Sequence, residues 1–281
     1  MNEPREMSWR DVLITAGTVF LVVVVGAGIA VGIWHRDIMS PRITFLGSGD
    51  RLSVLVSDGP SRLVIASGDD PTGFENALTS ILPISARRVD VLLVSGSKTT
   101  LLAPLAASQD EQVRLTRSLG SIPASIEASE FGEISELSTP ARIRLSPEIT
   151  LAIETAAPAD ADSDDPVSWR AIVERGPTRI VILSDGKAAG LFSLPPPASV
   201  IAVAGDDPIQ GWDATPGVAL VVAAGKLDGP KVRERFAMDN APRWGFRVAN
   251  GEALTFLFVE NGLAVSGESA QQPTVAATPM P

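Results

Sequence analysis

An uncharged apolar run near the N-terminus restricts where this chain can reside. It extends from Val12 to Trp34 and reads VLITAGTVFLVVVVGAGIAVGIW. A helix that rises about 1.5 Å per residue over this length crosses a hydrocarbon core about 30 Å thick. A cleaved signal peptide is the alternative, but its apolar region is shorter and ends at small residues, whereas this run ends in Trp-His-Arg-Asp. We therefore predict an uncleaved single-pass membrane anchor at residues 12–34, after a short tail, residues 1–11.

The charges beside this segment leave its orientation open. Two arginines precede it and two follow it by residue 42, so the positive bias that marks the cytoplasmic side nearly cancels. By default the bulk of the chain is expected on the extracytoplasmic side of the membrane. Gly28 and Gly32 have the small-xxx-small spacing of closely packed membrane helices. They predict a homodimer through the membrane segment.

Composition limits the chemistry available to the rest of the chain. The formal net charge of -10 argues against a nucleic-acid-binding surface, which needs a basic face. Cysteine is absent, so thiol catalysis, disulfides and zinc–thiolate sites are excluded. The single histidine, His35, directly follows the apolar run. A histidine-based active site in the later part of the chain is therefore excluded as well.

After a linker at residues 35–42, the pattern changes to alternating strands and helices. Three strands at 43–46, 53–57 and 61–66 predict a β-meander. Apolar residues at helical spacing predict a helix from Phe74 to Leu82 that ends at Pro83. Residues 89–94 then form a nearly continuous apolar run, as in a strand that is covered on both faces.

The second half of the chain repeats this theme, which suggests two half-domains of similar make-up. The expected strands are 142–145, 149–153, 169–174, 179–183, 200–204, 218–223, 254–259 and 263–266, with a helical stretch at 229–238. Asn261-Gly262 is a strong hairpin signal between the last two strands. The order predicts a two-sheet α/β sandwich. The tail, residues 267–281, is rich in Ser, Gln, Thr, Ala and Pro and is expected to be disordered.

Five segments also occur in an order known from one family. Residues 43–56, ITFLGSGDRLSVLV, look like an opening TFLDVGQGDAVLV hairpin, and LVIASG at 63–68 stands where that family has LLIDTG. RRVDVLLVSGSKTTL at 87–101 lies on RRLDLLVLTHPDADH. RIVILSDG at 179–186 and VIAVAGDD at 200–207 are similar to FLLTGD and DVLKVGHHG. The chain thus resembles the metallo-β-lactamase fold, in particular the hydrolase-like domain of competence-type DNA-uptake channel proteins. The resemblance implies a two-sheet αββα sandwich at residues 43–266.

The family's metal ligands are missing from the matching loop. There the family has His, His, Asp and His, which bind two metal ions, and the aligned positions here are Gly96, Lys98, Thr100 and Leu101. None of these supplies the imidazole, thiolate or carboxylate that binds a divalent metal in the usual way. The resemblance therefore implies a fold that has lost its metal centre, and no cofactor is expected.

Three carboxylate clusters leave a different metal site open. They are Asp69-Asp70, Asp185 and Asp206-Asp207, and each follows a predicted strand. Together they could form an oxygen-only Mg²⁺ or Ca²⁺ site. The simpler interpretation is turn chemistry, because Gly-Asp-Asp-Pro occurs at both 68–71 and 205–208. Lys98 would then pair with one of these aspartates in place of a metal.

These observations predict a membrane-anchored pseudoenzyme with an interaction or scaffold role at the cell envelope and a protein partner. One alternative is a metal-dependent hydrolase that uses the five aspartates. Another is a DNA-uptake accessory protein with a basic face around Arg87, Arg88, Arg114 and Arg117, against which the net charge stands.

Overall fold

The computed structural model of the chain describes residues 24–25, 39–82, 89–95, 116–119, 135–156, 168–185, 188–192, 200–204, 220–224, 244–260, 262–266 and 275–276. The chain divides into two compact units, Met1–Ser40 and Pro41–Pro281. Of the expected anchor only Val24 and Val25 are described, both in helical conformation. No helix within the described residues is long and apolar enough to cross a membrane. The anchor, together with the Gly28–Gly32 contact, stays a prediction.

Two sheets make up most of the second unit. The first has the order β16-β15-β14-β1-β2-β3-β4-β5-β6 and the second has the order β13-β12-β11-β10-β9-β8-β7. The strands of the first sheet are β1 (Arg42–Ser48), β2 (Arg51–Asp58), β3 (Ser61–Ala66), β4 (Val91–Ser95), β5 (Arg117–Leu119), β6 (Ser135–Glu136), β14 (Ala253–Val259), β15 (Gly262–Ser266) and β16 (Val275–Ala276). Those of the second are β7 (Ala141–Arg144), β8 (Ile149–Thr155), β9 (Trp169–Arg175), β10 (Thr178–Leu183), β11 (Val200–Val203), β12 (Leu220–Ala224) and β13 (Trp244–Val248).

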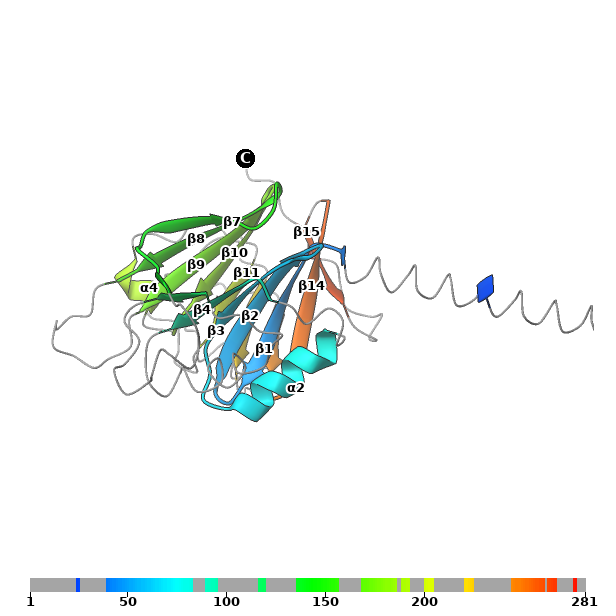
Figure 1. The fold of residues 1–281 in the computed structure, drawn as a ribbon, viewed down its shortest axis with the longest axis horizontal. Helices are drawn as coiled ribbons and strands as arrows, with labels where there is room; N and C mark the ends of the chain where they lie inside the picture. The colour runs from blue at the N-terminus through cyan, green and yellow to red at the C-terminus, as the bar shows by residue number, and fades with distance from the viewer. Residues whose placement is uncertain are drawn as a thin grey trace, which may run out of the picture. The chain divides into compact units, whose positions relative to one another are not determined.

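Strand pairing confirms the predicted meander and the C-terminal hairpin. β1, β2 and β3 pair in antiparallel succession, and β14 pairs with β15 up to Val259 opposite Gly262. The interpretation as two half-domains is wrong in one respect, because β14 and β15 belong to the first sheet. Figure 1 shows β14 beside β1, and the two strands pair from Arg42–Leu257 to Leu46–Ala253. Without β14, the apolar strand β1 would lie at an exposed sheet edge.

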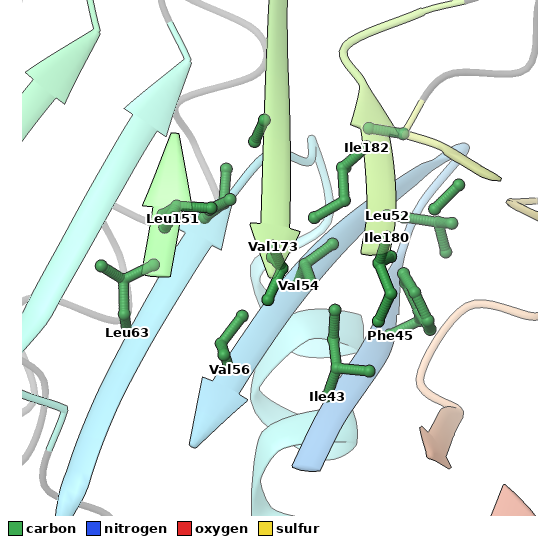
Figure 2. Close-up of a cluster of buried hydrophobic side chains, with 14 of the residues drawn as sticks. Ile43, Phe45, Leu52, Val54, Val56, Leu63, Leu151, Val173, Ile180 and Ile182 are labelled. Atoms are coloured by element: carbon green, nitrogen blue, oxygen red, sulfur yellow. The ribbon is translucent and has the colours of Figure 1, made fainter. Parts of the chain in front are cut away.

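The inner faces of the two sheets share one apolar core. In β1 to β3, alternate residues such as Ile43, Val54 and Leu63 point inward, as the two-residue period of a strand requires. Figure 2 shows them packed against inward residues of the second sheet, among them Val173 and Ile180. The two-sheet sandwich predicted from the strand pattern is therefore present.

Helix α2 (Pro71–Ile81) covers the outer face of the first sheet. Its residues Phe74, Ala77 and Leu78, with Leu82 beyond its end, pack against outward-facing residues of β1 to β3 such as Leu46 and Val64. The predicted helix is confirmed, and it begins three residues earlier than the apolar spacing indicated. On the second sheet the described helix is the short α4 (Ala188–Leu191), after which the Phe192 ring lies 4.8 Å from Arg170 Cζ. The helix expected at 229–238 lies outside the described residues.

The tail departs from its prediction at two residues. Val275 and Ala276 form β16 and pair with Leu263 and Gly262 of β15, although residues 267–281 were expected to be without structure. An unpaired edge strand presents free backbone N–H and C=O groups, and these can recruit even a short β-branched segment. The expectation of disorder is thus corrected for β16 alone, since the rest of the tail lies outside the described residues.

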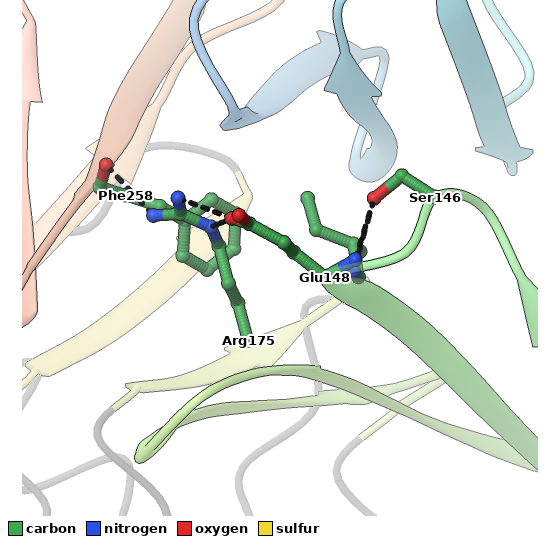
Figure 3. A network of polar contacts seen from close by, with 5 residues as sticks. Ser146, Glu148, Arg175 and Phe258 are labelled. Atoms are coloured by element: carbon green, nitrogen blue, oxygen red, sulfur yellow. Dashed lines mark hydrogen bonds and ion pairs between the residues drawn. The ribbon is translucent and has the colours of Figure 1, made fainter.

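A charged side chain joins the two sheets at one end of the sandwich. Arg175, at the end of β9, donates to the backbone oxygen of Phe258 in β14 at 3.1 Å, and its guanidinium lies 5.9 Å from the Phe258 ring. The same guanidinium pairs with Glu148 at 2.6 Å (Figure 3). We call the group Glu148, Arg175 and Phe258 the far edge.

Candidate functional site

Strands of both sheets end together at the side opposite the far edge. β3 and β4 run parallel, as do β10 and β11, so the residues after all four strands emerge on one side. The two sheets meet there, because Leu52 N at the start of β2 donates to Ala204 O just after β11, at 2.8 Å. We call this side, with Ser67–Asp70, Ser95, Ser184–Asp185 and Ala204, the mouth edge. The loops in which the sequence placed its candidate residues all leave from it.

Asp70 caps helix α2 and joins two distant turns. Its Oδ1 accepts from Gly73 N at 3.1 Å and its Oδ2 accepts from Asn250 Nδ2 at 2.5 Å. Pro71 follows at the start of the helix, where its missing N–H costs no hydrogen bond. The hydrogen bond from the Asn250 amide, followed by that from Gly73 N, lowers the pKa of the Asp70 carboxyl. The turn chemistry predicted for Gly-Asp-Asp-Pro at 68–71 is confirmed.

Asn250 is a central residue of the mouth edge that the sequence did not single out. Its Oδ1 accepts from Gly49 N at 2.8 Å while its Nδ2 donates to Asp70, so one amide links the β1–β2 turn to the start of α2. A Cβ on Gly73 would lie 1.8 Å from Asn250 Oδ1. Asn250 is 180 residues from Asp70 along the chain, and no local pattern could have connected them.

Asp69 is exposed and lies against the β1–β2 turn. A Cβ on Gly49 would lie only 1.9 Å from Asp69 Oδ1, and Gly49 has a φ of 65°, which favours glycine. Behind it, Ser53 Oγ accepts from Ser67 N at 3.0 Å and donates to Ser67 O at 2.9 Å. Ser48 Oγ donates to Asp70 O at 3.0 Å. These contacts fix the backbone of the β3–α2 connection against β1 and β2.

Asp185 plays a similar part after β10. Its Oδ1 accepts from Ala188 N at 2.8 Å, at the start of α4, and its Oδ2 accepts from Ser184 Oγ at 3.2 Å. Ser184 Oγ also accepts from Trp169 N at 3.1 Å, which ties this turn to the start of β9. Asp185 is thus positioned as a turn and helix-capping residue.

Two of the described carboxylates, Asp70 and Asp185, are engaged in hydrogen bonds within the fold. In Asp70 and Asp185 each oxygen accepts a hydrogen bond from a group within the same corner of the fold. Among the residues that the structure describes, no three His, Cys, Asp or Glu side chains gather closely enough to hold a metal ion. In the described part of the chain, Asp70 and Asp185 thus hold turns and the starts of helices.

The other predicted site residues lie outside the described part of the chain. These are Gly96, Lys98, Thr100, Leu101, Asp206 and Asp207. The strand before the first group ends at Ser95 and the strand before the second group ends at Val203. Both attachment points belong to the mouth edge, while the Lys98–aspartate ion pair stays a prediction. Of the proposed basic face, Arg117 is described, and it is exposed on β5.

Comparison with known proteins gives structural neighbours and no family. No protein-family model matches the chain, and no curated protein matches it. Similar solved structures include the metallo hydrolase Igni18 from Ignicoccus hospitalis, with 12% identity over 78% of this chain and 100% of that chain and a TM-score of 0.46. Zinc-bound PqqB from Methylobacterium extorquens has 13% identity over 58% and 72% of the two chains, with a TM-score of 0.41. The metallo-β-lactamase SMB-1 bound to 2-mercaptoethanesulfonate has 12% identity over 59% and 78%, with a TM-score of 0.40.

These neighbours are metallo-β-lactamase fold proteins. The described part of this chain is an α/β structure with two facing sheets. Similarity at this level carries no information about activity, ligands or partners. The specific resemblance to competence-type proteins therefore stays a prediction, as does the loss of the metal site.

Proposed function

We propose that this chain is a membrane-anchored, non-catalytic scaffold protein of the cell envelope, built on a metallo-β-lactamase-like sandwich. Residues 12–34 would anchor it, and the domain that follows would bind a protein partner. The observation that supports the proposal most strongly is the engagement of Asp70 and Asp185. Both carboxylates cap helices and join turns, which is a structural use of residues that a hydrolase would need as metal ligands.

The sequence supports the same proposal at the loop after β4. The resemblance places Gly96, Lys98, Thr100 and Leu101 where the family has its ligands, and His35 precedes the whole domain. A cationic Lys98 beside a divalent metal would repel it, since two positive charges at contact distance oppose each other. A turnover assay tests the proposal. Full chain in detergent, supplied in turn with zinc, manganese, magnesium and calcium, should not hydrolyse phosphodiester or β-lactam probes.

Metal-stimulated, chelator-sensitive hydrolysis that is lost in Asp185→Asn would contradict the proposal.

Membrane anchoring by residues 12–34 is tested by fractionation and extraction. Full chain should sediment with membranes and resist extraction by alkaline carbonate, whereas a variant without residues 12–34 should be released.

A second candidate is a hydrolase with an oxygen-only Mg²⁺ or Ca²⁺ site. The shared edge favours it, because the strands before Asp69-Asp70, Asp185 and Asp206-Asp207 all end at the mouth edge. Carboxylate oxygens are the ligands that these ions prefer. Calorimetric titration of the full chain with Mg²⁺ or Ca²⁺ separates the candidates. Saturable binding that is weakened in both Asp185→Asn and Asp206→Asn would favour the hydrolase.

A further inference from the structure

Among the described residues, two residue pairs connect β16 to the outer edge of the first sheet. β15 carries five residues, and β16 pairs with Gly262 and Leu263 alone. Leu263 is buried, whereas Ala264 and Val265 are half-buried and Ser266 is exposed. On its other side β15 pairs with β14 along its whole length, from Gly262 to Ser266. β15 is therefore paired with β14 over all five of its residues, whereas β16 pairs with two of them.

The tail's own sequence explains why the pairing is so short. In the observed register Ala276 faces Gly262 and Val275 faces Leu263. Continued by two residues, the same register would bring Pro273 opposite Val265. Proline has no backbone N–H to donate to a ladder, and it interrupts strand pairing. A second proline, Pro279, follows β16 in the sequence.

The connection between the two strands is also long for a hairpin. Eight residues, 267–274, separate β15 from β16, whereas tight hairpins use two to five. A tight turn would fix the register, and a long connection leaves it weakly specified. The pairing of β16 with β15 is therefore weak. A segment that forms more backbone pairs with β15 can displace β16.

We propose that the edge of β15 is a docking site for an extended segment of a partner protein, which adds to the sheet as an antiparallel strand and displaces β16. The segment has no proline across five residues, so that it can pair from Gly262 to Ser266. It carries apolar side chains two residues apart, opposite Leu263 and Val265, because these two face the core side of the sheet. In the observed register, Val275 is the residue paired with Leu263.

The proposal deepens the scaffold role by assigning the partner's binding mode, yet strand addition at this edge does not depend on the mouth edge being inactive. Metal-dependent activity would overturn the proposed function and leave the β15 site untouched. Conversely, a failure of strand addition would leave the non-catalytic mouth edge standing.

The test uses two synthetic peptides and the full chain. One peptide has the sequence of residues 271–278, and the other carries Pro273→Val in the same sequence. The chain is compared with its Val275→Pro plus Ala276→Pro variant, whose tail cannot pair. A Thr278→Pro plus Met280→Pro variant is the matched control, because it adds two prolines beyond the last observed pair.

We expect the Pro273→Val peptide to bind the Val275→Pro plus Ala276→Pro variant at least about tenfold more tightly than the native-sequence peptide does, a difference of about 1.4 kcal/mol. The unaltered chain and the control variant should bind it more weakly, since their tails compete. On binding, amide exchange at Ala264 to Ser266 should slow. Equal affinity for both peptides, or equal affinity for the tail-disrupted variant and the unaltered chain, would overturn the proposal.

Discussion

The two edges of the sandwich are held together by different kinds of contact. At the mouth edge, short side chains such as Asp70, Asp185 and Asn250 accept from or donate to nearby turns, and a backbone hydrogen bond from Leu52 to Ala204 joins the sheets. At the far edge, one long side chain, Arg175, spans from β9 to β14. The mouth edge thus depends on close backbone approach, and the far edge on a charged side chain that reaches across.

Substitutions are therefore expected to be tolerated differently at the two edges. Close backbone approach leaves no room for an added methyl group, whereas the partly buried Arg175 can be truncated with a moderate loss. Two of the candidate carboxylates at the mouth edge, Asp70 and Asp185, have a structural use, because hydrogen bonds to their oxygens hold the turns.

The largest effect is expected from adding one methyl group at the mouth edge. In Gly47→Ala the new Cβ would lie 1.9 Å from the backbone oxygen of Ala249, so the chain itself must shift. We expect a loss of about 2–3 kcal/mol in unfolding free energy, as for overpacked cores. Gly176→Ala, beside the far edge, is the matched control. Gly176 has a φ of 54° with nothing within 4 Å of an added Cβ, so only the backbone conformation opposes alanine, by about 1 kcal/mol.

Denaturant titration of both variants measures this contrast. Equal losses in Gly47→Ala and Gly176→Ala would show that the turn at Ala249 adapts freely. The comparison between the edges would then lose its basis.

Removal of the far-edge arginine should have the next largest effect. Arg175→Ala loses the hydrogen bond to Phe258 O, worth about 1 kcal/mol, and the contact with the Phe258 ring, worth about 0.5 kcal/mol. The ion pair with Glu148 adds little, because the Glu148 side chain is 61% exposed. We expect a total loss of about 1–2 kcal/mol by chemical denaturation, with Arg175→Lys in between because lysine lacks the guanidinium fork. Arg142→Ala, from a pair in which that arginine is 69% exposed, should cost less than about 0.5 kcal/mol.

The smallest effect is a pH dependence at the mouth edge. Hydrogen bonds from Asn250 and Gly73 lower the pKa of Asp70. Its contribution to stability is therefore fully present above the unfolded pKa of about 3.9 and is lost as the pH falls through the lower folded value. The gap in thermal midpoint between the unaltered chain and Asp70→Asn should be constant near neutrality and should shrink below about pH 4. In an Asn250→Ala background, which lacks the main cause of the shift, the gap should vary less with pH. A gap that stays constant from pH 7 to pH 2 would contradict this assignment.

Periodicity was sufficient to predict the elements that pack locally. The meander, helix α2 and the β14–β15 hairpin follow from apolar spacing and turn residues close together in sequence. The start of α2 was placed late, because the apolar pattern begins at Phe74 whereas the cap and Pro71 lie before it. Asp70 as the N-cap and Pro71 in the first turn both indicate the start of the helix, but apolar spacing does not take these residues into account.

Contacts between distant segments could not be predicted from the sequence. Neither the pairing of β14 with β1 nor the bonds that Asn250 makes has a local signature, since each joins residues about 200 positions apart. The sequence also does not predict that Arg175 bridges the two sheets, because an arginine at a strand end more often faces solvent. The capping role of Asp70 could be predicted, because a Gly-Asp-Asp-Pro turn suggests capping. Its hydrogen-bond partner Asn250 could not be predicted.

Equilibrium dialysis of the full chain against zinc, manganese, magnesium and calcium, followed by elemental analysis, tests the central claim most directly. If the aspartates of the mouth edge hold turns and helix ends, metal content should stay well below one ion per chain, and Asp185→Asn should not change it. One or two ions per chain, lost in Asp185→Asn while the variant remains folded, would contradict the account and identify the mouth edge as a metal centre.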